Sequence, residues 1–218
     1  MPLWQIQQGD FPMKLVLATK NKDKIQEIKS LLQDLKIEIL TFKDFDSFPE
    51  TIEDQLTLEG NAGKKAQAIW QNFKLPVLAD DTGLFVDALN GKPGVYSSRF
   101  AGENATYKQN RQKLLYMLRD VPKEKRTATF RTIIVFIDKK GSKFVVQGEC
   151  KGYIGFSEKG ENGFGYDSIF YYNNSNRTFA ELSSEEKNKI SHRGIALIKM
   201  KEVIEENFKN INYTKTKR

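Results

Sequence analysis

Two adjacent carboxylates, Asp80 and Asp81, follow the short apolar run 76–79 in this chain. Neighbouring negative charges repel each other, and a divalent cation relieves that repulsion. Mg²⁺ commonly takes one or two carboxylates together with the phosphates of a substrate. The pair therefore predicts carboxylate-held Mg²⁺ acting on a phosphorylated substrate, with Glu53 and Glu59 as candidates for a third ligand. A simple turn after a buried strand is the structural alternative.

The chain contains one histidine, His192, within Ser191-His192-Arg193. Histidine is the side chain most often recruited for proton transfer near neutral pH. Any general base must therefore be His192 or an acid. Any metal must be held mainly by carboxylates, because there is no second histidine and Cys150 is the sole cysteine. The alternative is a histidine that makes structural hydrogen bonds at a helix start.

The polar segment Thr19-Lys20-Asn21-Lys22-Asp23-Lys24 lies between a predicted strand and a predicted helix. Ligands of open α/β sheets bind at the carboxyl ends of strands, and a helix N-terminus presents free N–H groups that suit phosphate. Thr19 and Asn21 offer side-chain donors, and Lys24 adds positive charge. Ordinary capping of the helix by Asn21 is the alternative. The segment lacks the glycines of a P-loop.

Two further motifs bring polar and aromatic groups together. Asn61 and Lys65 are four residues apart and share a helix face, which faces either a ligand or solvent. In Gly163-Phe164-Gly165-Tyr166-Asp167 the glycines allow close approach of the backbone to a ligand. An aromatic ring between them can stack on a planar base. A plain hairpin turn is the alternative for this second motif.

The elements that must position these residues follow from hydrophobic periodicity. Strands are predicted at about 14–18, 37–42, 76–79, 127–138, 143–154 and just before residue 172, and helices at about 25–35, 57–73, 104–118 and from residue 183 or 191 to about 207. The β-α-β opening and the later antiparallel hairpin predict an α/β fold with a mixed β-sheet and flanking helices. We expect two lobes around a nucleotide-binding cleft.

Length and composition fit one large domain over 13–208, with an N-terminal extension over 1–12 and a basic C-terminal tail over 209–218. The single cysteine suits a reducing compartment, and no apolar run is long enough to span a bilayer. The cytoplasm is therefore the expected location, with no membrane partner. The net charge of +7 also suggests a nucleic-acid binder. Four of those charges lie in the last ten residues, and nucleic-acid binding leaves the Asp80-Asp81 pair unexplained.

Six motifs in order closely resemble the inosine triphosphate pyrophosphatase family, the XTP/dITP diphosphatases that remove noncanonical purine nucleotides. They are Ala18-Thr19-x-Asn21-x-x-Lys24-x-x-Glu27, Asn61-Ala-x-x-Lys65-Ala, Asp80-Asp-Thr-Gly-Leu84, Pro93-Gly-Val-Tyr-Ser-Ser-Arg99, Gly163-Phe-Gly-Tyr-Asp167 and Glu186-Lys-Asn-x-x-Ser-His-Arg193. The resemblance covers about residues 13–200. It implies a homodimer that hydrolyses ITP, dITP or XTP to the monophosphate and pyrophosphate, with one or more Mg²⁺ per subunit. A related pyrophosphatase acting on modified pyrimidine nucleotides is the alternative enzyme.

The resemblance also implies a role for each motif. Asp81 is the expected proton acceptor, and Asp81, Glu53 and Asp80 are the expected metal contacts. The substrate contacts that it implies are Thr19, Lys20, Asn21, Lys22, Asp23, Lys24, Lys65, Thr82, Phe164, Gly165, Tyr166, Asp167, Lys187, His192 and Arg193. Thr82 and Ser168 replace the serine and proline usual in the family, and Gln55 replaces its usual glycine in the loop that carries Glu53.

The assembled motifs change the interpretation of His192. Asp81 is the better-placed base, and His192 follows the base-stacking motif in sequence. Donors from His192, Arg193 or Lys187 are expected to pair with the 6-carbonyl oxygen of hypoxanthine or xanthine. Adenine carries an amino group there, and an unpaired buried polar group costs about 1–3 kcal/mol. We therefore expect His192 to determine purine selectivity rather than to perform the chemistry.

Overall fold

The structure, a computed structural model, describes residues 13–172 and 175–215. In these residues a seven-stranded sheet is formed by β1 (Met13–Leu17), β2 (Ile37–Leu40), β3 (Val77–Val86), β4 (Pro93–Gly94), β5 (Thr127–Ile137), β6 (Lys143–Ile154) and β7 (Phe170–Tyr172). The α-helices are α1 (Lys22–Leu31), α2 (Leu58–Phe73), α3 (Tyr107–Met117), α4 (Ser184–Ile190) and α5 (His192–Lys215). The predicted mixed α/β fold is confirmed.

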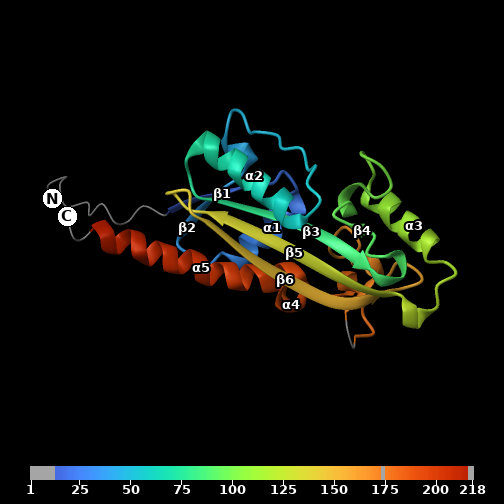
Figure 1. The fold of residues 1–218 in the computed structure, drawn as a ribbon. Coiled ribbons are helices and arrows are strands. Elements are labelled where there is room, and N and C mark those ends of the chain that lie inside the picture. The colour runs from blue at the N-terminus through green and yellow to red at the C-terminus, as the bar shows by residue number, and fades with distance from the viewer. Residues whose placement is uncertain (1–12, 173–174, 216–218) are drawn as a thin grey trace.

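The sheet has a parallel part and an antiparallel part. Its strand order is β2-β1-β3-β5-β6-β7, with β4 paired to β3. Strand β1 runs parallel to β2 and β3, whereas the pairs β3–β5, β5–β6 and β6–β7 are antiparallel. The long β5–β6 hairpin forms the axis of the molecule, and α2 and α5 lie on opposite sides of it (Figure 1). The predicted hairpin is confirmed.

Strand β3 extends well beyond the predicted strand at 76–79. It continues through Asp80 and Asp81 to Val86, so the acidic pair lies within a strand and not in a turn after it. The reason is that β5 pairs with β3 along its whole length, from Val77 opposite Ile137 to Val86 opposite Ala128. A continuous backbone ladder outweighs the low strand propensity of aspartate.

A gap in the sheet lies on the other edge of β3. Strand β1 pairs with β3 only at Val77 and Leu78, and β4 pairs with the same edge only at Leu84 and Phe85. Between these points, residues 79–83 have no strand partner on that edge among the described residues. This gap opens beside the acidic pair, at the carboxyl end of β1, where ligands of α/β sheets bind.

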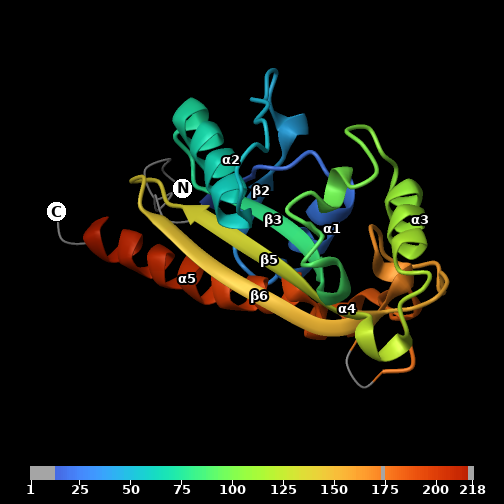
Figure 2. The ribbon, with the colours of Figure 1, turned by 45° about the vertical axis from the view of Figure 1, so that its right-hand side comes forward.

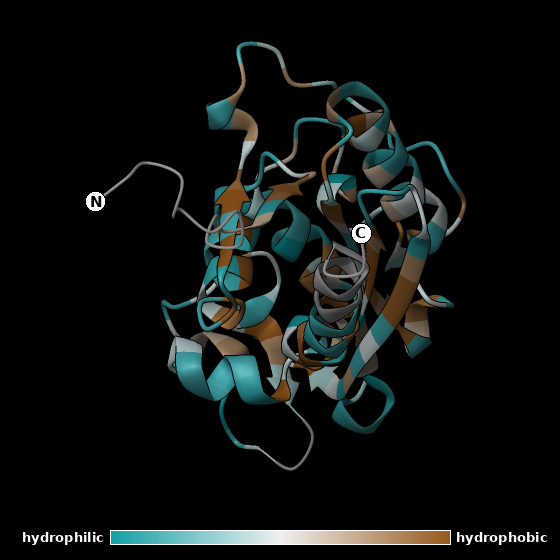
Figure 3. Cartoon of the chain, turned by 90° about the vertical axis from the view of Figure 1, so that its left-hand side faces the viewer, coloured by the Kyte–Doolittle hydropathy of each residue, from teal (hydrophilic) through white to brown (hydrophobic). Residues whose placement is uncertain are grey.

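Three hydrophobic clusters form the cores of the two lobes. In the first lobe, α1 and α5 pack on one face of the sheet through Ile28 and Leu197, and α2 packs on the other through Ala62 and Ile69. The second lobe surrounds the far end of the hairpin, where α3 contributes Leu114 to the third cluster. The strands are largely hydrophobic and the helices carry hydrophilic stretches, as expected for two-sided burial (Figure 3).

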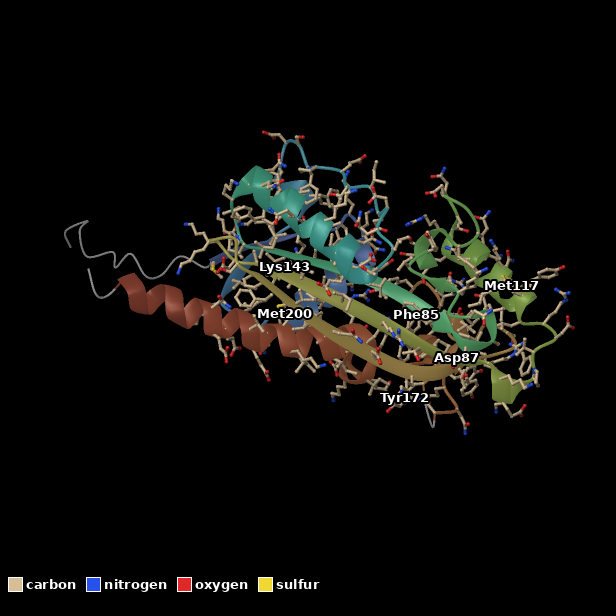
Figure 4. The ribbon with its side chains drawn as sticks, viewed as in Figure 1. Phe85, Asp87, Met117, Lys143, Tyr172 and Met200 are labelled. Carbon is tan, nitrogen blue, oxygen red and sulfur yellow. The ribbon has the colours of Figure 1, made fainter. Side chains whose placement is uncertain are left out.

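The lobes occupy opposite ends of the sheet. Met200 on α5 and Lys143 at the start of β6 mark the first lobe, whereas Phe85, Asp87 and Met117 mark the second (Figure 4). Helix α3 stands beyond the end of β3, and α2 stands over the opposite half of the sheet (Figure 2). The gap beside residues 79–83 therefore falls between the lobes.

The last helical region differs from the prediction. Two helices follow one another, because Ser183 caps α4 through its hydroxyl and Ser191 interrupts the helical path with an extended backbone. Helix α5 then continues to Lys215 and not only to about residue 207, since residues 208–215 contain no glycine or proline that would end it. The predicted extension over 1–12 lies outside the described residues, as do the last three residues of the predicted tail. In the part of the chain that is described, no helix is long and apolar enough to cross a membrane.

Candidate functional site

A cavity of about 440 Å³ lies at the gap between the lobes, within the range typical of small-molecule sites. Most of the predicted site residues line it, namely Thr19, Lys20, Asn21, Lys24, Glu53, Lys65, Asp81, Thr82, Phe164, Gly165, Tyr166, Asp167, Lys187, His192 and Arg193. Three predicted residues, Lys22, Asp23 and Asp80, are not part of its wall. Segments far apart in sequence thus meet in one site.

The two carboxylates of the acidic pair point to opposite faces of the sheet. Successive strand residues alternate between faces, so Asp81 shares the α2 face with Val77 and Ala79. Asp80 shares the face covered by α1 and α5 with Leu78. The structure therefore does not bring Asp80 together with Asp81 as a joint metal ligand. The sequence argument from mutual repulsion placed both aspartates directly after the strand, whereas within β3 the alternation of side chains separates their carboxylates.

Asp81 is held by α2. Its Oδ1 accepts a hydrogen bond from Lys65 Nζ at 2.9 Å, and its Oδ2 accepts one from Asn61 Nδ2 at 3.5 Å. The shared helix face of these two side chains therefore faces the site and not solvent. Burial raises the pKa of the Asp81 carboxyl against the lowering effect of Lys65. A raised pKa makes this carboxylate a better proton acceptor.

The carboxylates of Glu53 and Asp81 both contact the ammonium group of Lys65. Lys65 Nζ lies 2.9 Å from Glu53 Oε1 and 2.9 Å from Asp81 Oδ1, so both carboxylates already face a shared cation. Two carboxylates leave coordination positions free for phosphate oxygens, which is how a hard divalent ion is usually bound with nucleotides. Among the described residues no three acidic, histidine or cysteine side chains form a closed metal cluster. The residues present therefore fit a divalent cation shared with substrate.

The loop that carries Glu53 is fixed from two directions. Arg99 Nη2 donates to the Glu53 carbonyl at 2.6 Å, and its Nη1 donates to the Glu53 carboxylate at 3.4 Å. Gln55 N donates to Asn61 Oδ1 at 3.0 Å. These bonds place Glu53 beside Asp81 although Gln55 replaces the glycine that the resemblance predicts in this loop.

Asp80 belongs to a chain of buried ion pairs, named here the ion-pair chain: Lys24, Asp80, Arg193, Glu27, Lys187 and Asp167. Lys24 Nζ and Arg193 Nη2 lie 3.0 and 3.2 Å from Asp80 Oδ2. Glu27 pairs with Arg193 at 2.5 Å and with Lys187 at 2.7 Å. Lys187 also pairs with Asp167 at 2.6 Å. The chain alternates cation and anion from segment 19–24, named here the phosphate-side segment, to residues 163–167, named here the aromatic loop.

The electrostatics of this chain fix its charges. Burial alone would raise the pKa of the Asp80 carboxyl, but Lys24 and Arg193 outweigh it and hold that pKa well below the usual range. Burial disfavours the charged form of Arg193, and Asp80 and Glu27 overcome it and raise the pKa of the guanidinium. Asp80 is thus held in its anionic form by the two cations with which it pairs.

The aromatic loop is shaped by Asp167. Its Oδ2 accepts a hydrogen bond from Phe164 N at 2.9 Å. Gly163 has φ of +72°, and a Cβ there would lie 2.2 Å from the same carboxylate oxygen, so only glycine fits. Lys187 Nζ lies 5.0 Å from the centroid of the Phe164 ring, and Arg193 Cζ lies 5.6 Å from it. The loop forms part of the cavity wall and presents an aromatic ring to the cavity. The alternative of a plain hairpin turn does not account for this arrangement.

His192 begins α5 and is almost fully buried. Its ring stacks on Phe130 with centroids 4.5 Å apart, and its Nδ1 has no hydrogen-bond partner among the described residues. Burial, followed by the charges of Arg193 and Lys187, lowers the pKa of the imidazole well below its ordinary value of 6.5. The neutral ring therefore has one donor and one acceptor nitrogen. Because it carries no charge, it does not suit binding of phosphate as a cation.

We expect the stability of the protein to fall between about pH 7.5 and about pH 5.5. Below its ordinary pKa of 6.5, His192 binds a proton in the unfolded chain but not in the folded one, so acidification favours unfolding. The expected loss is about 1.4 kcal/mol of unfolding free energy, measured by urea titration at both pH values. His192→Phe keeps a stacking ring without a titrating group, and it should abolish the difference. An equal pH response in both proteins would contradict this assignment.

The phosphate-side segment combines both predicted roles. Asn21 caps α1, since its Oδ1 accepts from Asp23 N and Lys24 N, which is the structural alternative considered for this residue. Thr19 and Lys24 nevertheless line the cavity. Lys20 lies at the rim, paired with exposed Glu50. The segment thus offers one partly buried and one exposed lysine to an anionic group.

Sequence analysis assigned no role to three residues that contact predicted site residues, namely Glu27, Arg99 and Tyr107. Glu27 stood in a quoted motif without a role, although its place three residues after Lys24 on one helix face could have indicated one. Arg99 likewise ended a quoted motif without an assigned contact. Tyr107, which lines the cavity, begins α3 in a segment without any recognisable motif. No sequence signal marked it.

Comparisons with known proteins place this geometry in a known group. Residues 15–203 match the model of the Ham1 family. The dITP/XTP pyrophosphatase of Thermoanaerobacter pseudethanolicus is 46% identical over 192 residues, which is 88% of this chain and 96% of that protein. The dITP/XTP pyrophosphatase of Geobacter sulfurreducens is 48% identical over 87% of this chain and 95% of its own length. A HAM1 protein from Coxiella burnetii has a similar structure, with a TM-score of 0.81 and 41% identity over 89% of this chain and 99% of that one.

Proposed function

The chain belongs to the Ham1 family, and from that premise we propose that it hydrolyses noncanonical purine nucleoside triphosphates to the monophosphate and pyrophosphate. The observation that carries the proposal is the arrangement of one cavity: a raised-pKa carboxylate beside a second carboxylate, a lysine-bearing helix start and an aromatic loop. The substrate class follows from the relatives named dITP/XTP pyrophosphatase. A homodimer remains a prediction.

Asp81 is proposed as the general base. It takes a proton from water as the water oxygen attacks the α-phosphorus, and the bond to the bridging oxygen of pyrophosphate breaks. The raised pKa of this carboxyl supports the role, because a base with a pKa closer to neutral transfers protons more effectively. Lys65, which contacts Asp81 and Glu53, holds both carboxylates in position.

Family membership implies a divalent metal requirement, and we propose Mg²⁺, held by Asp81 and Glu53. When bound, the cation neutralises part of the charge that develops on the phosphate oxygens. Lys24 and Lys20 are proposed to attract the outer phosphates at the start of α1, where the helix dipole also favours anions. Asp80 is not carried forward as a ligand, because it is not part of the cavity wall and its Oδ2 is paired with Lys24 and Arg193.

His192 is proposed to recognise the 6-oxo group of the base. Arg193 uses four of its five N–H donors on Asp80, Glu27 and Thr82. Lys187 uses two of its three on Glu27 and Asp167. The buried side-chain atoms without a hydrogen-bond partner among the described residues are His192 Nδ1 and Asp80 Oδ1, and of these two residues only His192 lines the cavity.

The proposal is tested by pyrophosphate release from ITP, dITP, XTP, ATP and UTP, with Mg²⁺ and with chelator. We expect turnover of the 6-oxo purines at least tenfold faster than that of ATP, and loss of all turnover on chelation. Equal rates for ATP and ITP would reject the substrate class, and preference for UTP would favour pyrimidine nucleotides instead. In the same panel, the substitution His192→Ala should raise KM for ITP more than it lowers kcat.

A further inference from the structure

Tyr107 joins the two lobes across the cavity. It is the first residue of α3, which belongs to the second lobe, yet its hydroxyl contacts the start of α1 in the first lobe. The hydroxyl accepts a hydrogen bond from Asn21 Nδ2 at 2.9 Å and donates one to Asp23 Oδ2 at 3.2 Å. The contact spans more than eighty residues of sequence. In Figure 2, α3 lies to the right of α1.

The tyrosine also reaches the opposite wall of the cavity. Its ring lies 5.8 Å from the Phe164 ring, centroid to centroid, so one side chain touches both the phosphate-side segment and the aromatic loop. Desolvation by burial raises the pKa of the phenol, so the hydroxyl keeps the proton that it donates to Asp23. Asn21 in turn uses its Oδ1 to cap α1 through Asp23 N and Lys24 N. Tyr107 therefore fixes the amide orientation of the residue that caps the phosphate-side helix.

We propose that Tyr107 is a positioning residue that holds the two lobes together over the triphosphate of a bound nucleotide. The inference rests on the proposed function for the nature of the ligand, but the contact itself exists without ligand. The hydroxyl orders the start of α1 before substrate arrives, and so lowers the entropic penalty of binding. A residue that acts in this way changes substrate affinity and leaves the chemical step nearly unchanged.

The test is Tyr107→Phe, which removes two hydrogen bonds and keeps the ring beside Phe164. We expect the loss of these partly exposed hydrogen bonds to raise KM for ITP roughly three- to tenfold. The value of kcat should stay within about twofold of that of the unchanged protein. The matched control is Tyr116→Phe on the same helix. That side chain is 66% exposed and stacks on Arg119, and its loss should change neither parameter.

A second measurement uses the protein without nucleotide. Amide hydrogen exchange in Tyr107→Phe should be faster at Asp23 and Lys24, whose N–H groups are bonded to Asn21, and unchanged in the β5–β6 hairpin. This readout separates the two proposals, because it needs no turnover. Failure of the unaltered protein to hydrolyse ITP would reject the proposed function and leave the exchange result as the test of the contact.

The outcomes divide cleanly. A higher KM together with locally faster exchange supports the proposal. Unchanged exchange, or faster exchange in the hairpin as well, overturns it, since the contact would then be idle or merely structural. A higher KM without faster exchange overturns it too, because the hydroxyl would then bind the substrate directly. Faster exchange with unchanged KM shows that the contact has no part in binding, which also overturns it.

Discussion

Asp81→Asn is expected to lower kcat for ITP by roughly a thousandfold, within the range attributed to a general base. Asparagine has nearly the same shape, and its amide oxygen still accepts the bond from Lys65 that Asp81 accepts now. It cannot take a proton from water, and it is a weaker ligand for a divalent cation. The loss should therefore appear in the chemical step, measured by single-turnover pyrophosphate release.

Two measurements make this result specific. Binding of a non-hydrolysable ITP analogue should weaken by less than about tenfold, which would show that the site still assembles. Asp54→Asn is the matched control, because Asp54 lies in the same loop as Glu53 but pairs with Lys64 at the surface. It should keep full activity. Retention of more than about a tenth of the activity in Asp81→Asn would contradict the assignment of the base.

Asp80→Asn is expected to reduce the free energy of unfolding by roughly 3 kcal/mol. Removing one partner of a buried ion pair leaves the other partner uncompensated. Here Lys24 would lose its anion, and Arg193 would keep only Glu27. The measurement is urea unfolding monitored by circular dichroism. Activity should fall as well, since Lys24 and Arg193 both line the cavity.

The comparison with Glu53→Gln distinguishes the two acids. Activity lost in Glu53→Gln should return in part at raised Mg²⁺ concentration, because a ligand has been weakened. Activity lost in Asp80→Asn should not return. Glu38→Gln serves as the stability control, since Glu38 and Lys14 form an exposed pair, and exposed pairs contribute about 0–1 kcal/mol. A stable Asp80→Asn protein whose activity Mg²⁺ restores would show that Asp80 is a ligand.

The fold could be predicted largely from sequence, because its signals are local. The hairpin followed from β-branched and aromatic runs around Lys140-Gly141, and α2 followed from apolar residues at helical spacing. The end of β3 was missed, since a strand that continues through two aspartates depends on pairing with β5. No local pattern reports the length of a distant partner strand.

The site was predicted as a set of motifs but not as a geometry. Fifteen of the eighteen substrate-contact, base and metal candidates line one cavity, as their order along the chain implied. The separation of Asp80 from Asp81 was missed, because it follows from strand alternation once the pair is known to lie within β3. Tyr107 was missed because its partners are more than eighty residues away. Such contacts need the tertiary structure.

The ion-pair chain has a consequence for how this protein can change over generations. Three anions and three cations neutralise one another in alternation, so substituting any one leaves its neighbours unbalanced in a buried setting. Substitutions here are expected to be strongly epistatic: a change at Lys187 is tolerated only after a matching change at Asp167 or Glu27. A change of nucleobase specificity through these residues must therefore proceed by paired substitutions, because each single substitution destabilises the folded protein.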